Sequence, residues 1–142
     1  MKCSFMRKMN ILLAEDDADD KFFFVYFLKD RQDIRVLDCA ENGLDVFKYL
    51  EDPGKEKGLP DIILLDQNMP KMNGLDTLKR LKADPEYAHI PVFVYSTYAD
   101  QNLTDNCMAC GAVSVAQKPT NKDGYNQMID EFIERIASKV GR

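Results

Sequence analysis

The chain contains one histidine, His89, and this scarcity limits the catalytic chemistry open to it. A serine–histidine–aspartate triad or a histidine-based metal site has little material here. His89 stands two residues before Pro91, so we expect it in a surface turn. The apolar runs are also short, well under the roughly 20 residues that a membrane-spanning helix needs. The residues from Met1 to Lys8 are basic, but only a short strand-like run follows them, which disfavours a signal peptide.

Positive charge is also in short supply. Lys and Arg number 19 against 24 Asp and Glu, the formal net charge is −5, and no basic cluster occurs along the chain. We therefore expect no nucleic acid as a partner. From the short apolar runs and the unlikely signal peptide, we expect no membrane partner and a cytoplasmic location.

The four cysteines do not form the pattern of a disulfide framework or of a zinc site. Cys107 and Cys110 form a C-x-x-C motif, but the motif closes a predicted helix just before Gly111. Redox motifs of this kind open a helix, where the N-terminus lowers the pKa of the thiol. We interpret both cysteines as small, partly buried helix residues.

Strand-like apolar runs alternate with stretches of helical length and period throughout the chain. Strands are predicted over 9–16, 34–39, 61–66, 91–96 and 112–116, and helices over 19–29, 43–51, 74–84, 100–110 and 122–138, with a surface loop over 52–60. This alternation predicts an α/β fold, a doubly wound five-stranded parallel sheet with helices on both faces. We expect a single domain over 9–142 after an N-terminal extension, 1–8.

Polar side chains stand where four of the predicted strands end. Glu15 and Asp16 close the first strand, Asp66 the third and Ser96 the fourth, and Lys118 follows the fifth. Because right-handed crossovers place the carboxyl ends of parallel strands along one edge, we expect these side chains to converge. Taken singly, each has an ordinary explanation, such as acids at a helix N-terminus; their joint occurrence favours a site.

The chemistry of this set points to a metal and to phosphoryl transfer. Three carboxylates against one ammonium leave a formal charge of −2, which suits a divalent cation. Oxygen ligands on an open rim favour Mg²⁺, or Mn²⁺, over zinc. A metal, the Lys118 cation and the Ser96 hydroxyl around a carboxylate nucleophile, Asp66, are the parts that phosphoryl transfer needs.

With these motifs the sequence resembles the receiver domains of two-component response regulators over residues 9–138. The resemblance implies the flavodoxin-like strand order 2-1-3-4-5. It also implies that Asp66 is the phosphoacceptor, and that Glu15 and Asp16 bind the metal with Asp66. Asn68 would offer its backbone carbonyl to the same ion.

The resemblance extends to the two remaining strand ends. Ser96 matches the switch hydroxyl, and Lys118 matches the lysine that precedes a proline, typically cis, here Pro119. Val115 departs from the family, which often has Tyr or Phe there, and Tyr98 is bulky beside the phosphorylation site.

The function implied is that of a stand-alone receiver. It would accept a phosphoryl group from a histidine kinase or a histidine phosphotransfer protein and signal to an unknown downstream protein through altered contacts. It would be no enzyme beyond its own phosphorylation and dephosphorylation. The open alternatives are a relay intermediate or phosphate sink, an unphosphorylated interaction module, and a flavodoxin-like cofactor protein. The last is disfavoured, because five of the six residues from Glu15 to Asp20 are acidic and would repel a phosphate.

The first predicted helix carries an aromatic run, Phe22 to Phe27. A helix turns one stripe inward, so Phe22 and Tyr26, four apart, should lie away from the sheet. We expect core residues among Phe23, Phe24, Phe27 and Leu28, and a docking surface for the helical phosphodonor domain at the outer pair.

Overall fold

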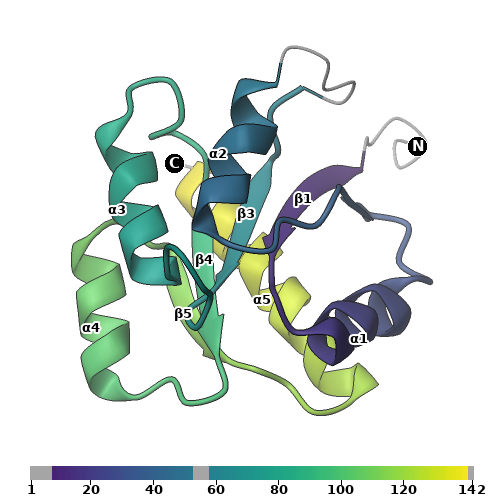
Figure 1. The fold of residues 1–142 in the computed structure, drawn as a ribbon. Helices are drawn as coiled ribbons and strands as arrows, with labels where there is room; N and C mark the ends of the chain where they lie inside the picture. The colour runs from purple at the N-terminus through teal and green to yellow at the C-terminus, as the bar shows by residue number, and fades with distance from the viewer. Residues whose placement is uncertain (1–7, 53–57, 141–142) are drawn as a thin grey trace.

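A computed structural model describes residues 8–52 and 58–140 of the chain (Figure 1). The predicted N-terminal extension, apart from Lys8, and most of the predicted surface loop at 52–60 lie outside the described residues.

Five parallel strands form one sheet in the order β2-β1-β3-β4-β5, which confirms the predicted topology. The strands are β1 (Met9–Ala14), β2 (Ile34–Val36), β3 (Ile62–Asp66), β4 (Val92–Ser96) and β5 (Ser114–Gln117). β3 and β4 are buried along their whole length, as expected for the central strands of a sheet covered on both faces.

Five helices cover the two faces of the sheet and complete the doubly wound fold (Figure 1). They are α1 (Ala18–Leu28), α2 (Gly43–Glu51), α3 (Gly74–Ala83), α4 (Gln101–Ala109) and α5 (Lys122–Val140). α1 and α5 share one hydrophobic core with their face of the sheet, and α2, α3 and α4 share the other. No helix of the described residues is both long and apolar enough to cross a bilayer.

Side-chain caps define where four of the helices begin. The carboxylate or amide oxygen of each cap accepts a hydrogen bond from the backbone N–H three residues later; the caps are Asp17, Asn42, Asn73 and Asp100. α1 therefore begins at Ala18, and the chain between β1 and this helix is only three residues long. The cap thus keeps the acids that follow β1 close to the sheet edge.

All five strands differ from their predicted bounds. β1 ends at Ala14 instead of residue 16, and β3 and β4 each start one residue later than predicted. β2 was expected to continue to residue 39 but ends at Val36, although single backbone bonds from Leu37 to Ile11 and from Ala40 to Leu13 keep the chain beside β1. β5 was expected from residue 112 but starts at Ser114, because the Ala112 N–H closes the end of α4 on a helix carbonyl.

The aromatic run of α1 divides between the core and the surface. Phe24 and Leu28 are buried and Phe27 is half-buried, whereas Phe23, expected in the core, is exposed. The reason is the narrow stripe by which α1 contacts the sheet and α5. Phe22 and Tyr26 lie away from the sheet as predicted; they are 58% and 49% exposed, and their rings stack 5.2 Å apart.

Two further sequence interpretations are confirmed. His89 is exposed in the turn that precedes β4. Cys107 is buried near the end of α4, and burial raises the pKa of its thiol to about 11, so it is not a reactive thiolate. Cys39, Cys107 and Cys110 are free thiols.

A close backbone approach holds α3 against the loop that follows β3. At Gly74, a Cβ atom would lie 2.8 Å from the Asp66 carbonyl oxygen and 3.0 Å from the Cα atom of Gln67. The Gly74 N–H donates to the Gln67 carbonyl at 3.0 Å. Backbone atoms cannot move aside as a flexible side chain does, so the absence of a side chain at this position keeps the Asp66 loop in place.

Gly74→Ala is therefore expected to lower the free energy of unfolding by about 1–3 kcal/mol, the usual range for overpacking. Urea denaturation measures this change. Lys79→Ala, at an exposed position of the same helix, should stay within about 0.5 kcal/mol of the wild type. Equal stability of the two variants would contradict the close-packing argument.

Candidate functional site

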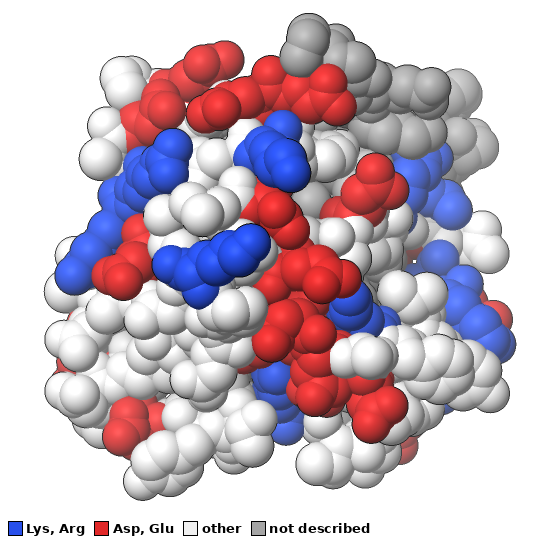
Figure 2. All heavy atoms as spheres, viewed as in Figure 1, with Lys and Arg blue, Asp and Glu red and all other residues white. Residues whose placement is uncertain are grey.

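The acidic residues predicted at the strand ends meet at one edge of the sheet. One carboxylate oxygen each from Glu15, Asp16 and Asp66 lies within 4.8 Å of the other two. Glu15 and Asp66 are buried, and Asp16 is exposed. Figure 2 shows acidic side chains gathered in the centre of the face that is seen in Figure 1. The β1 and β3 ends thus form an all-oxygen cluster of the kind that Mg²⁺ and Mn²⁺ prefer.

Lys118 supplies the positive charge of this cluster. Its Nζ atom lies 2.8 Å from Asp20 Oδ2, 3.1 Å from Glu15 Oε1 and 3.3 Å from Asp66 Oδ2. Burial lowers the pKa of the Lys118 ammonium, but the three carboxylates outweigh that effect and raise it above its usual value. Lys118 therefore stays charged and ties the ends of β1, β3 and β5 to α1.

Glu15 is the most deeply buried acid of the site. Its Oε1 accepts a 2.6 Å hydrogen bond from the Tyr95 hydroxyl, and its Oε2 accepts one from the Asp17 N–H at 3.2 Å. Burial raises the pKa of the Glu15 carboxyl to about 7, against the lowering effect of Tyr95 and with a further rise from the charge of Asp66. Burial and the Glu15 charge raise the pKa of Tyr95, so its phenol remains a proton donor.

Asp66 stands at the end of β3 with its side chain directed into the cluster. Its Oδ1 accepts a hydrogen bond from the Asn68 N–H at 3.2 Å, and its Oδ2 faces Lys118. This bond keeps the Asn68 backbone next to the acids. The role of the Asn68 carbonyl as a metal ligand stays a prediction.

Ser96 ends β4, the strand beside Asp66. Its backbone carbonyl accepts from the Lys118 N–H at 2.8 Å, and its Oγ accepts from the Tyr98 N–H at 3.3 Å. The Tyr98 ring is 74% exposed. Val115 on β5 is half-buried against the core that α2, α3 and α4 cover. Side chains alternate between the two faces of the sheet along β4, and Tyr95 belongs to the opposite core.

One expectation from the resemblance is wrong. The bond between Lys118 and Pro119 is trans, and no peptide bond of residues 8–52 and 58–140 is cis. The trans form is the one that an X–Pro bond favours intrinsically, by about 0.5–1 kcal/mol. The chain passes from β5 to α5 without a cis turn.

The sequence analysis does not identify two residues of the site, Asp20 and Tyr95. Asp20 was one of several acids in a row, and only the fold shows that it reaches Lys118. Tyr95 lies in an otherwise apolar strand segment before Ser96. A buried phenol needs a hydrogen-bond partner, and that requirement was the signal that could have pointed to the acids.

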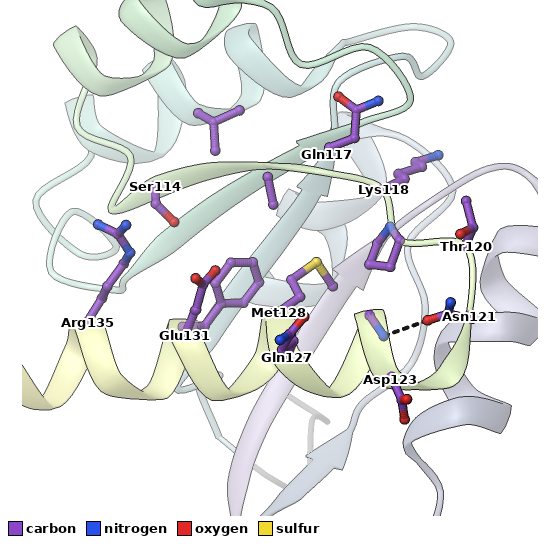
Figure 3. Close-up of a pocket in the computed structure, with 15 residues that line it drawn as sticks. Ser114, Gln117, Lys118, Thr120, Asn121, Asp123, Gln127, Met128, Glu131 and Arg135 are labelled. Atoms are coloured by element: carbon purple, nitrogen blue, oxygen red, sulfur yellow. Dashed lines mark hydrogen bonds between the residues drawn. The ribbon is translucent and has the colours of Figure 1, made fainter.

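An open groove of about 860 Å³ runs between β5 and α5 (Figure 3). Lys118 stands at its rim, but its ammonium is turned toward Glu15, Asp20 and Asp66, none of which lines the groove. The groove is therefore separate from the acidic cluster.

Comparison with known proteins gives a consistent result. A family model described as the response regulator receiver domain matches residues 11–130. The chain is 30% identical to a protein-glutamate methylesterase/protein-glutamine glutaminase of Clostridium acetobutylicum over 92% of this chain and 36% of that protein. It is 26% identical to chemotaxis protein CheY-3 of Vibrio cholerae over 96% of this chain and 100% of that one. The chain thus spans about a third of the methylesterases it matches.

Solved structures agree with the sequence matches. The phosphorylated cyanobacterial phytochrome response regulator RcpA is similar with a TM-score of 0.77 and 27% identity, covering 90% of this chain and 93% of that one. The Mn²⁺-bound form of response regulator Rcp1 is similar with a TM-score of 0.71 and 28% identity, over 84% and 88% of the two chains.

The burial of Glu15 predicts how the metal-free protein responds to pH. The pKa of Glu15 is raised in the folded protein from 4.5 to about 7, so the folded state binds this proton more tightly than the unfolded state. The resulting stabilisation is complete below pH 4.5 and is lost as the pH rises through 7, by on the order of 3 kcal/mol.

Urea unfolding in excess EDTA between pH 5 and 8 measures this effect. Glu15→Gln, which carries no titrating proton, is expected to remove most of the decline. A wild type whose stability does not fall relative to Glu15→Gln across this range would contradict the buried-carboxyl explanation.

Proposed function

The chain belongs to the family of response regulator receiver domains, which act in two-component phosphorelay signalling, and on this premise we propose that Asp66 is its phosphoacceptor. The observation that carries the proposal is the contact of the Lys118 ammonium with Asp66 inside a cluster of carboxylates. An aspartate at the end of a central parallel strand stands where α/β sheets present ligands. The adjacent cation offsets charge on an incoming phosphoryl group.

Glu15, Asp16 and Asp66 fit a divalent cation, because one carboxylate oxygen of each lies within 4.8 Å of the other two and only one ammonium opposes their charge. We propose that they hold Mg²⁺, or Mn²⁺, together with the carbonyl of Asn68. When bound, the ion would offset negative charge and so reduce the repulsion between Asp66 and an anionic phosphodonor.

The chain's own residues then carry out the transfer. A carboxylate oxygen of Asp66 attacks phosphorus, the P–N bond to the donor histidine breaks, and the imidazole leaves while Asp66 becomes an acyl phosphate. Lys118 pairs with one phosphoryl oxygen. Ser96 donates a hydrogen bond to another once its hydroxyl turns from the Tyr98 N–H.

We further propose that the donor is a histidine kinase or histidine phosphotransfer protein in the cytoplasm, and that the phosphorylated form signals by binding another protein. The receiver itself is a signalling domain; its only catalysis would be its own phosphorylation and dephosphorylation. The family and the intact site support this function over that of a flavodoxin-like cofactor protein.

Incubation with acetyl phosphate and Mg²⁺ should add one phosphate to the wild type, detectable by intact-mass measurement. Asp66→Asn should take up none, because it lacks the nucleophilic carboxylate. Asp105→Asn, a matched change on the exposed face of α4, should be phosphorylated normally. Labelling of Asp66→Asn equal to that of the wild type would disprove the assignment.

Replacement of both Glu15 and Asp16 by Ala should abolish phosphorylation at millimolar Mg²⁺, through loss of the metal ligands.

The exposed side of α1 provides a docking surface for the phosphodonor. Phe22 and Tyr26 form an exposed stacked pair, and Phe23 and Val25 extend the apolar area beside them. α1 begins shortly after β1, and its first turn is linked to the acidic cluster because Lys118 contacts both Asp20 and Asp66. A partner seated on this end of the helix therefore approaches the site. We propose that the helical phosphohistidine domain of the donor binds here.

Phe22→Ala combined with Tyr26→Ala should slow phosphoryl transfer from a kinase that phosphorylates the wild type by about tenfold or more, the effect of a lost interface anchor. Acetyl phosphate labelling should be unchanged, since a small donor does not need the surface. Leu44→Ala removes a similarly exposed apolar side chain from α2 and should affect neither rate. Equal losses with both donors would indicate damage to the fold and contradict the docking role.

A further inference from the structure

Tyr95 lies buried beneath the acidic site. It is fully buried at the penultimate position of β4, and it is the register neighbour of Asp66 on β3. Its hydroxyl bonds Glu15 Oε1 at 2.6 Å, and the Lys118 Nζ lies 5.1 Å from the centre of its ring. One side chain thus contacts both an acid of the proposed metal set and the cation of the site.

The hydrogen bond connects strands that are not neighbours. Glu15 follows β1 and Tyr95 lies in β4, with β3 between them in the sheet. The bond therefore passes across the end of β3, where Asp66 stands. The glutamate is long enough to make this reach, and an aspartate, shorter by one methylene, is not expected to reach the phenol from the same backbone position.

The length of Glu15 also has a cost for metal binding. A glutamate has one more rotatable side-chain bond than an aspartate and loses more freedom when it is held in one orientation. Here the Tyr95 hydroxyl and Lys118 both bind Oε1, while the Asp17 N–H binds Oε2. The carboxylate is therefore held in one orientation before any ion arrives.

We propose that Tyr95 is a positioning residue of the metal site, one that orients Glu15 through its hydroxyl without touching the ion. This inference rests on the proposed function, because it takes Glu15 and Asp16 as metal ligands. Residues that hydrogen-bond to metal ligands typically change metal affinity by about 10–100-fold when they are removed. The simpler explanation is a core tyrosine that uses Glu15 only as a hydrogen-bond acceptor; it predicts no effect on metal affinity.

The test is a titration of the unphosphorylated protein with Mn²⁺, followed by electron paramagnetic resonance of the free ion. Tyr95→Phe keeps the ring under Lys118 and removes only the hydroxyl. It is expected to weaken Mn²⁺ binding about tenfold, at the lower end of the effect of such residues. Tyr87→Phe is the matched control; this buried phenol packs against Phe47 in the other core, and its loss should leave the affinity unchanged.

A second background shows whether Tyr95 acts through Glu15. Glu15→Asp withdraws the carboxylate from the phenol, so Tyr95→Phe should have no further effect on Mn²⁺ affinity in that background. Independent, multiplying losses would overturn the inference, as would a Tyr95→Phe affinity equal to that of Tyr87→Phe. A structural role alone predicts lower stability in both backgrounds without this dependence.

Kinetics separate orientation from chemistry. In Tyr95→Phe the Mg²⁺ concentration for half-maximal labelling by acetyl phosphate should rise about tenfold, in step with the affinity. The rate at saturating Mg²⁺ should match that of the wild type. A lower maximal rate with an unchanged Mg²⁺ concentration for half-maximal labelling would overturn the inference.

Asp16→Asn separates the existence of the metal site from the role of Tyr95. It should abolish Mn²⁺ binding at the site if the acids are metal ligands at all. Wild-type binding by Asp16→Asn would refute the proposed metal site, whereas loss there with an unaffected Tyr95→Phe would refute only the role of Tyr95.

Discussion

The structure depends on one lysine that partly offsets the charge of a cluster of acids at the carboxyl edge of the sheet. Lys118 contacts Glu15, Asp20 and Asp66, which come from the ends of β1 and β3 and from the first turn of α1. Without a cation, buried carboxylates so close together repel one another and hold protons. The ammonium reduces the repulsion among the carboxylates in the folded protein. It leaves an excess of negative charge that a divalent ion can offset.

The protein positions this cluster with strands that are buried along their whole length. β3 and β4 are buried on both faces, so the ends that carry Asp66 and Ser96 have little freedom. Side-chain caps start α1 and α3 beside the same edge, and the close backbone approach at Gly74 holds the loop after Asp66. The acids can therefore remain near each other, because the free energy of burying the sheet opposes their repulsion.

The large side chains near Ser96 are distributed unlike the family pattern. β5 carries Val115 at the position often occupied by an aromatic residue. The two rings that flank Ser96 have separate environments: Tyr95 is buried under Lys118 and bonded to Glu15, and Tyr98 is exposed. An aromatic side chain on β4 thus takes part in the acidic site itself, and the loop after β4 presents another to solvent.

The sequence by itself determined the strand–helix alternation, the order of chemically important strand ends and the outward position of Phe22 and Tyr26. These follow from local periodicity and from the rule that parallel strands end on one edge. The convergence of Glu15, Asp66 and Lys118 was predictable for the same reason. The short β2, the late start of β5 and the exposure of Phe23 were not, because they depend on which neighbouring chain satisfies each backbone group and each face.

The tertiary structure alone decided which acid Lys118 binds most closely and which acid meets Tyr95. Asp20 is the nearest partner of Lys118, at 2.8 Å, although the two lie 98 residues apart in the chain. Glu15 and Tyr95 lie 80 residues apart, on strands that do not adjoin. Periodicity places a side chain on a face and at an edge, but the partner of a hydrogen bond is set by distances of a few ångströms between distant segments. Those distances exist only after the sheet has packed.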